Sequence, residues 1–226
     1  MTKIPSLTEF AKIGAHLGHK TYRRFPEMAK FISGKKNTIH IIDLSKLRKC
    51  LKGSVDFMKK ASKQDKNILL VGTKPGAKDI VQKYGEKYNI PYVKERWLGG
   101  LMTNFGTVKK LIKKFNSMKS EKKQGKWDKY TKKEQVDFEK ELNKLESLVG
   151  GIKNLKQVPD ILYIIDTVDE EIALKEAKKE DIPVIAMINT DENPDLIDYP
   201  IPCNNDSIKT IDLVTQTLLK EFKSKK

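Results

Sequence analysis

The chain has 226 residues, of which 38% are hydrophobic and 33% charged, and it carries a formal net charge of +15. This length and composition predict a folded protein of one or two domains and argue against a disordered chain. Cys50 and Cys203 lie far apart without zinc-type spacing, which argues against a disulfide framework and favours a reducing compartment. Residues 1–20 hold no long apolar run, and no apolar stretch is long enough to span a bilayer, so we expect a soluble cytoplasmic protein.

The charge is unevenly distributed. Residues 1–107 carry 22 basic and 8 acidic side chains, residues 108–157 carry 15 and 7, and residues 158–226 carry 8 and 15. Solvated helix surfaces explain scattered lysines but not this excess in the first two thirds, which favours a polyanion, most simply nucleic acid. A membrane surface is disfavoured because no predicted helix combines a basic face with a broadly aromatic one. We expect the acidic last third to face solvent or a basic protein neighbour.

The first part of the chain predicts a capped helix, two short strands and a longer helix. The capping box Ser6-x-x-Glu9 marks the start of the first helix. Asp43 is placed to cap the long helix, in which apolar residues recur at helical spacing. The later segments of this part are a basic stretch without helical periodicity at 18–26, strands at 31–34 and 39–42, and a helix at 44–63.

From residue 67 onward, strands alternate with helices. The first run, 67–72, is continuously apolar, as is typical of a strand buried on both faces. Such alternation predicts an α/β fold with a parallel sheet and helices on both faces, because crossovers are right-handed. The predicted elements are strands at 67–72, 91–93, 161–166, 184–189 and 199–202, and helices at 77–88, 170–180 and 206–222.

Residues 104–150 interrupt this alternation with two amphipathic helices joined by a polar turn. A second capping box, Thr131-x-x-Glu134, marks the start of the second helix. Each apolar stripe is narrow, which predicts an antiparallel coiled-coil hairpin that packs on itself. The lysine-rich tip, 119–133, also holds Trp127 and Tyr130. We therefore expect an α/β globular domain, basic in its N-terminal part and acidic in its C-terminal part, formed by residues 1–103 plus 151–226, and a protruding hairpin formed by residues 104–150.

Two segments invite a chemical interpretation, and each has a simpler structural one. The loop at 72–76 could hold a phosphate through backbone N–H groups and Lys74, but it lacks the spacing of a nucleotide-binding loop and also fits an ordinary strand-to-helix turn. His16-x-x-His19 could contribute to a metal site, but no third ligand is evident nearby, which favours packing or a phosphate hydrogen bond. We expect no metal site.

Three aspartates, Asp166, Asp169 and Asp191, stand at predicted strand ends, where α/β enzymes place functional groups. Helix capping and loop solvation also explain them, and we favour that interpretation.

The segment 96–105 mixes a cation, aromatic rings and a glycine pair. It fits a hinge between sheet and hairpin, and also a close contact with RNA through Arg96 and backbone donors.

The segment 96–105, together with 14–19, 39–44, 71–74 and 150–152, resembles the universal small-subunit ribosomal protein two family of bacterial or organellar type, in order along nearly the whole chain. The resemblance implies a flavodoxin-like (Rossmann-like) α/β domain with a protruding hairpin, and a structural constituent of the small ribosomal subunit without catalysis or cofactors. It further implies contacts to small-subunit ribosomal RNA and neighbouring ribosomal proteins, with ribosomal protein one left open as a partner. The expected location is the cytoplasmic ribosome, with an organellar matrix or stroma as the alternative, and we expect neither membrane contact nor a homo-oligomer.

We expect RNA to be bound through its phosphates, with little reading of bases. The alternative from another class is a nucleotide- or phosphate-using enzyme on a doubly wound α/β fold; a third possibility is an accessory factor that only visits the ribosome. The predicted RNA-binding residues are cations, Lys20, Arg23, Arg24, Lys35, Lys36, Lys74, Arg96, Lys109 and Lys110, together with four residues that shape the hinge, Trp97, Gly99, Gly100 and Asn104.

Overall fold

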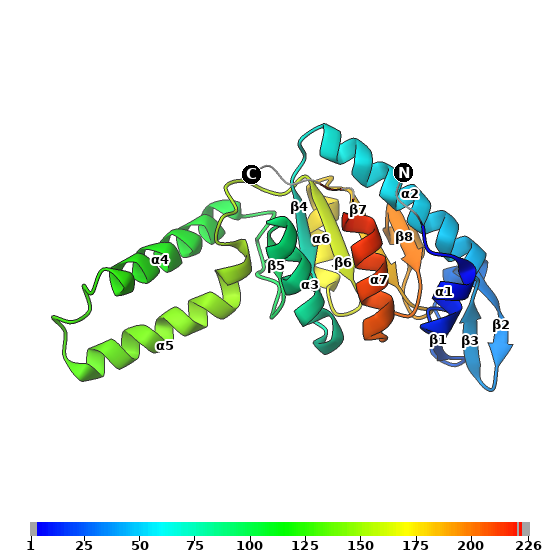
Figure 1. Cartoon of the computed structure of the whole chain (residues 1–226), viewed down its shortest axis with the longest axis horizontal. Coiled ribbons are helices and arrows are strands. Elements are labelled where there is room, and N and C mark those ends of the chain that lie inside the picture. Colours follow the sequence, from blue (N-terminus) through cyan, green and yellow to red (C-terminus); the bar gives the residue numbers. More distant parts are fainter. Residues whose placement is uncertain (1–3, 221, 223–226) are drawn as a thin grey trace.

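The structure is a computed structural model that describes residues 4–220 and residue 222. Its centre is a five-stranded parallel sheet in the order β5-β4-β6-β7-β8, which confirms the predicted α/β class (Figure 1). All residues of the three central strands are buried, as their continuous apolar runs predict. The strands are β4 (Ile68–Val71), β5 (Tyr92–Val93), β6 (Ile161–Ile165), β7 (Val184–Ile188) and β8 (Tyr199–Pro202).

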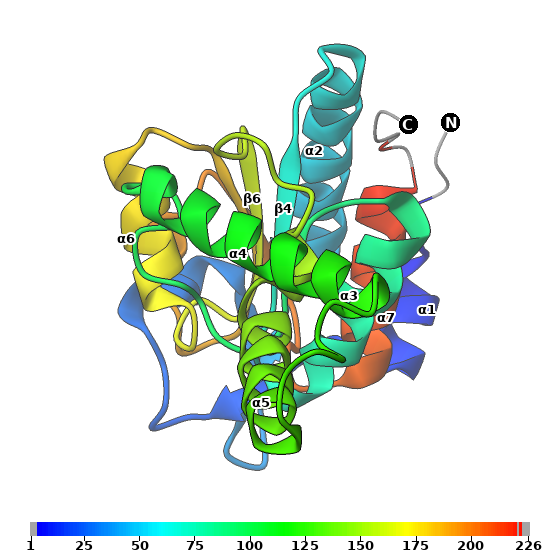
Figure 2. The same cartoon turned by 90° about the vertical axis from the view of Figure 1, so that its left-hand side faces the viewer.

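Helices cover both faces of this sheet, as the alternation predicts (Figure 2). Successive side chains of a strand point to opposite faces, so Leu70 belongs to one apolar core and Leu69 to the other. One face packs against α2 (Leu44–Lys63), α3 (Pro75–Tyr88) and α7 (Ile208–Leu219), and the other packs against α6 (Glu171–Lys179) and the root of the hairpin.

Helix starts agree with the predicted caps. Ser6 begins α1 (Leu7–Lys12) with a complete capping box, and Asp43 accepts hydrogen bonds from the first backbone N–H groups of α2. The predicted helix at 206–222 is shorter in the structure, because Ser207 caps it and its regular part ends at Leu219; residue 221 lies outside the described residues.

A second, antiparallel sheet has the order β1-β3-β2 and lies at one end of the molecule (Figure 1). The stretch at 18–26, for which the sequence predicts no helix, begins within a strand that pairs with β3. The paired positions, Leu17 with Ile41 and Lys20 with Ile39, are 24 and 19 residues apart in the chain. Two backbone hydrogen bonds, Phe25 N to Thr190 O and Asn204 N to Ala15 O, join this region to the main sheet. The strands are β1 (Leu17–Lys20), β2 (Ile32–Lys36) and β3 (Ile39–Ile42).

The predicted helical hairpin consists of α4 (Phe105–Lys123) and α5 (Lys132–Val149), and it projects from the opposite end of the molecule (Figure 1). Thr131 and Glu134 form the predicted capping box of α5. Asn104 occupies the N-cap position of α4, but its side chain accepts from the Thr107 hydroxyl and makes no capping bond to the backbone. The apolar seam between the helices contains Val108, Ile112, Phe115, Met118, Leu142, Leu145 and Val149.

The return of the chain from the hairpin requires a glycine. A Cβ atom at Gly151 would lie 2.2 Å from the backbone oxygen of Tyr92, so no side chain fits between this turn and β5.

Cys50 and Cys203 are free thiols. Among the described helices, none combines the length and the apolarity that crossing a membrane requires.

Candidate nucleic-acid interface

One group of predicted cations lies on the small antiparallel sheet. Lys20 ends β1, Arg24 follows in the next turn, and Lys35 and Lys36 end β2. All four side chains are exposed, and among the described residues none of them forms an ion pair with a carboxylate. We call these four residues the sheet-end cations.

A second group lies at the root of the hairpin. Arg96 precedes the hairpin, and Lys109 and Lys110 follow the first turn of α4, outside its buried stripe of Val108 and Ile112. These three cations are also exposed, and within the described part of the chain no carboxylate pairs with them. We call them the hairpin-root cations. The hairpin leaves the α/β body on the side away from the small sheet, so the structure separates the predicted cations into two groups (Figure 1).

Lys74 differs from both groups. Its ammonium group donates to Asp166 at 2.9 Å and also to Asp206, and its side chain is only 21% exposed. Burial alone would lower the pKa of Lys74, but the two carboxylates outweigh this effect and raise it. The backbone N–H of Thr73 donates to the buried Glu170 at 2.9 Å. Two donors of the loop at 72–76, the Thr73 N–H and the Lys74 ammonium, are therefore bound to carboxylates of the chain itself.

Carboxylates of the acidic last third also meet the basic N-terminal segment. Arg23 donates to Asp191 at 2.8 Å, and the ring nitrogens of His19 lie 3.5 Å from Asp191 and 3.6 Å from Asp206. The sequence predicts that the acidic third faces solvent or a basic protein neighbour; Asp206 is half exposed, whereas Asp191 is turned toward cations of the same chain. In the described residues, no group of three or more histidine, cysteine or acidic side chains is arranged to hold a metal ion.

Of the three aspartates at strand ends, Asp166 caps the loop that follows it. Asp166 adopts a positive φ of 73° and accepts from the backbone N–H of Val168 at 3.0 Å. Burial and the neighbouring Asp166 raise the pKa of Asp169. The Asp166 contacts agree with the capping interpretation, whereas Asp191 is paired with Arg23.

The segment before the hairpin is organised by a residue that the sequence analysis missed. Glu176 of α6 is buried and accepts from Trp97 Nε1 at 3.0 Å and from the backbone N–H of Gly100 at 2.7 Å. The same carboxylate accepts from the backbone N–H groups of Met102 and Thr103 at 3.0 and 3.3 Å. The sequence does contain a pattern that points to this residue, because helical spacing places Glu176 on the same helix face as the buried residues 173 and 177.

The predicted hinge residues have different positions in this segment. Trp97 is buried against the core and exposes 6% of its surface, so it shapes the loop from inside. Gly100 has a φ of +86°, which a residue with a side chain rarely adopts. Gly99 has open space around it and imposes no such requirement. Asn104 is exposed at the start of α4.

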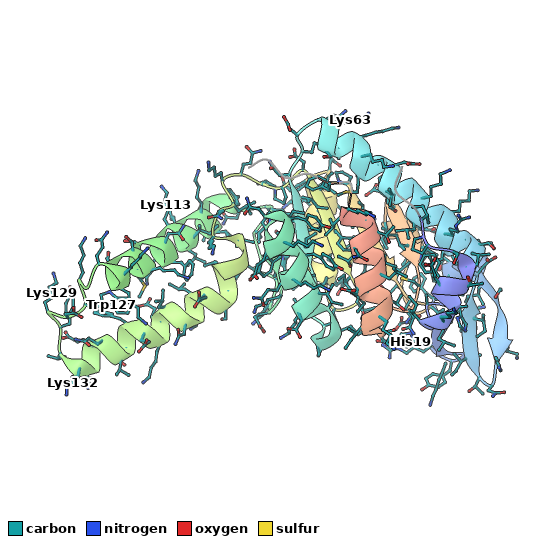
Figure 3. All side chains as sticks on the ribbon, viewed as in Figure 1. His19, Lys63, Lys113, Trp127, Lys129 and Lys132 are labelled. Atoms are coloured by element: carbon teal, nitrogen blue, oxygen red, sulfur yellow. The ribbon has the colours of Figure 1, made fainter. Side chains whose placement is uncertain are left out.

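Sequence analysis also missed a basic face on α2. Leu47, Leu51 and Val55 point into the core, and the rest of the helix surface exposes cations in its first half and at its end, with Asp56 between them. Figure 3 shows Lys63 pointing outward at the end of this helix. Helical spacing alone identifies this face, whose exposed members are Lys46, Arg48, Lys49, Lys52, Lys60 and Lys63.

Comparisons with known proteins give a consistent match. Residues 11–224 match the family described as "Ribosomal protein S2". A protein named "Small ribosomal subunit protein uS2" from a Nitratiruptor species is 44% identical over 92% of this chain and 78% of its own length. Proteins of the same name from Coprothermobacter proteolyticus and Fusobacterium nucleatum subsp. nucleatum are 41% and 40% identical over 95% of this chain, and over 80% and 87% of their own lengths.

Proposed function

Since this chain belongs to the ribosomal protein S2 family and is a non-enzymatic structural component of the small ribosomal subunit, we propose that it binds ribosomal RNA through two separate cationic surfaces. Its partners are ribosomal RNA and ribosomal proteins. One surface is formed by the sheet-end cations, and the other is formed by the hairpin-root cations.

The observation that carries this proposal is the distribution of free and paired charge. Among the predicted cations, the seven in these two groups are exposed and have no carboxylate partners among the described residues, whereas Lys74 and Arg23 are held by aspartates. An exposed cation is available to neutralise a phosphate, but a paired one must first give up its carboxylate. Lys74 and Arg23 remain candidate contacts, and we expect their replacement to weaken binding less than replacement of the free cations.

The proposed mode of binding is recognition of RNA shape. Lysines act mainly as point charges against phosphates, and base edges in the deep major groove of an RNA helix are not accessible to side chains. Two surfaces on different sides of a packed α/β body can hold two RNA segments at a set distance. The protein would then fix RNA geometry without chemistry, in the ribosome of the cytoplasm.

Salt dependence of binding tests this proposal. Each neutralised phosphate changes the slope of log K against log salt by roughly 0.7–0.9, so the seven free cations predict a slope of about −5 to −6 for small-subunit RNA. Replacing Lys35 and Lys36 by alanine should make the slope less steep by roughly 1.4–1.8, and so should replacing Lys109 and Lys110. Lys175→Ala is the matched control, because Lys175 is exposed but pairs with Glu171 on α6. If either of the two double replacements left the slope of log K against log salt unchanged, the two-surface proposal would be refuted.

A further inference from the structure

We propose that a cavity at the tip of the hairpin binds one unpaired nucleobase of RNA. This inference rests on the proposed function, because it names the part of an RNA that the tip would take. The cavity has a volume of about 380 Å³ and lies between α4 and α5, beneath the segment that connects them. This volume is within the range of small-molecule sites, about 300–1,000 Å³.

Aromatic side chains form much of the cavity wall. Trp127 and Phe138 lie with ring centroids 5.5 Å apart, and Tyr130 meets Phe138 edge-on at 5.1 Å. Trp127 is nearly buried, whereas Tyr130 is 39% exposed, so the tyrosine forms the open side. Figure 3 shows Trp127 lying between the two helices. Such rings stack with any base, because every base has a π face.

The charges around the cavity favour an anionic occupant. Lys126 and Lys129 line it, and among the described residues neither pairs with a carboxylate, whereas Lys114 is held by Glu141. The ammonium of Lys129 lies 5.3 Å from the centre of the Tyr130 ring. Figure 3 shows Lys129 and Lys132 at the outer end of the hairpin. Phosphates on either side of a bound base would meet these lysines, while an apolar protein side chain would leave them without partners.

One acidic group in the wall is suited to a base. Glu121 lines the cavity and accepts a hydrogen bond from the Ser117 hydroxyl at 2.9 Å, which leaves further acceptor capacity on its carboxylate. The exocyclic amino groups of adenine, cytosine and guanine are donors that match it. A base in a continuous duplex remains stacked on its neighbours, so only an unpaired nucleotide can enter.

A bulged RNA tests this inference directly. The probe is an RNA duplex with a single bulged 2-aminopurine, compared with a fully paired duplex of equal length. The full chain should bind the bulged RNA about tenfold more tightly and should quench its fluorescence by stacking. Tyr130→Ala should remove both effects and Tyr130→Phe should keep them. Val136→Ala is the matched control, because Val136 is 50% exposed on the same hairpin and does not line the cavity.

The outcomes separate this inference from the proposed function. Equal, salt-dependent binding of the two RNAs without quenching would overturn the nucleobase site and leave the phosphate contacts intact. No binding of either probe or of small-subunit RNA would refute both. A photoreactive benzoylphenylalanine at position 130, in salt-washed small subunits, gives a second readout. A cross-link to an unpaired nucleotide is expected, and a cross-link to a protein neighbour would overturn the inference.

Discussion

The indole N–H of Trp97 donates to the carboxylate of Glu176 at 3.0 Å, although the two residues are 79 positions apart in the sequence. The same carboxylate accepts from three backbone N–H groups, those of Gly100, Met102 and Thr103. Since the hairpin begins directly after this segment, a buried acid on α6 helps to attach the root of the hairpin to the α/β body, in addition to apolar packing. The position of the hairpin-root cations therefore depends on Glu176, which is itself an acid.

Replacement of Glu176 by glutamine should weaken this attachment. A glutamine keeps one acceptor oxygen and turns an NH₂ group toward N–H donors, so some buried donors lose their partner. We expect a loss of about 2 kcal/mol in the free energy of unfolding, measured with denaturant. Backbone amides of Gly100 and Met102 should also exchange hydrogen faster.

Glu171→Gln is the matched control for that variant. Glu171 lies on the same helix but is exposed, and its partner Lys175 is also in solvent. An exposed pair of this kind contributes little, so the free energy of unfolding should change by less than about 0.5 kcal/mol. Equal effects of the two replacements would contradict the role assigned to Glu176.

Lowering the pH should weaken the contact between Glu176 and the root of the hairpin. Burial alone would raise the pKa of Glu176, but hydrogen bonds from Trp97 and the backbone outweigh it and hold this pKa below its ordinary value of 4.5. A carboxyl group with a lowered pKa stabilises the fold above its unfolded pKa, and this contribution disappears as pH falls through the folded pKa. The NMR signal of the Trp97 indole proton should therefore stay constant above pH 4.5 and shift below it.

The titration has its own control. In the Glu176→Gln variant the indole signal should no longer follow pH in this range, because the titrating group is gone. A midpoint above 4.5 in the unmodified protein would contradict the lowered pKa.

Gly151→Ala should strain the return of the hairpin to the sheet. The new Cβ would lie 2.2 Å from the backbone oxygen of Tyr92, and backbone must move to relieve this overlap. We expect a loss of about 1–3 kcal/mol in the free energy of unfolding. Gly53→Ala, in open space inside α2, should instead stabilise by about 0.5–1 kcal/mol, and thermal unfolding of both variants compares them. A stable Gly151→Ala protein would show that β5 adjusts freely.

Lys74→Met should affect stability more than RNA binding. The replacement removes the partner of Asp166, whose side chain is 11% exposed, while Asp206 remains half in solvent. We expect the free energy of unfolding to fall by about 1–3 kcal/mol, which is less than the effect of breaking a fully buried ion pair. A second substitution, Asp166→Asn, should restore much of the lost stability, because the substitution removes the uncompensated carboxylate charge. If Lys74→Met instead leaves stability unchanged and weakens RNA binding as much as the Lys35/Lys36 replacement, Lys74 is a phosphate contact.

Much of the fold follows from local sequence patterns. The capping boxes at Ser6 and Thr131 and the long helix after Asp43 are confirmed at the predicted positions. The buried central strands follow from continuous apolar runs, and the hairpin follows from narrow stripes at helical spacing. These features depend on neighbours within a few residues, which a sequence displays directly.

The amino-acid sequence by itself determined the α/β alternation, the amphipathic hairpin and the excess of cations in the first two thirds of the chain. Only the tertiary structure decided which cations are free, because the partners of Lys74 and Arg23 lie 92 or more positions away. It likewise decided that β1 is a strand and that Glu176 holds the hairpin root. The physical reason is that pairing and burial depend on distances in space, and residues far apart in the chain come within a few ångströms only when the sheet and its crossovers have formed.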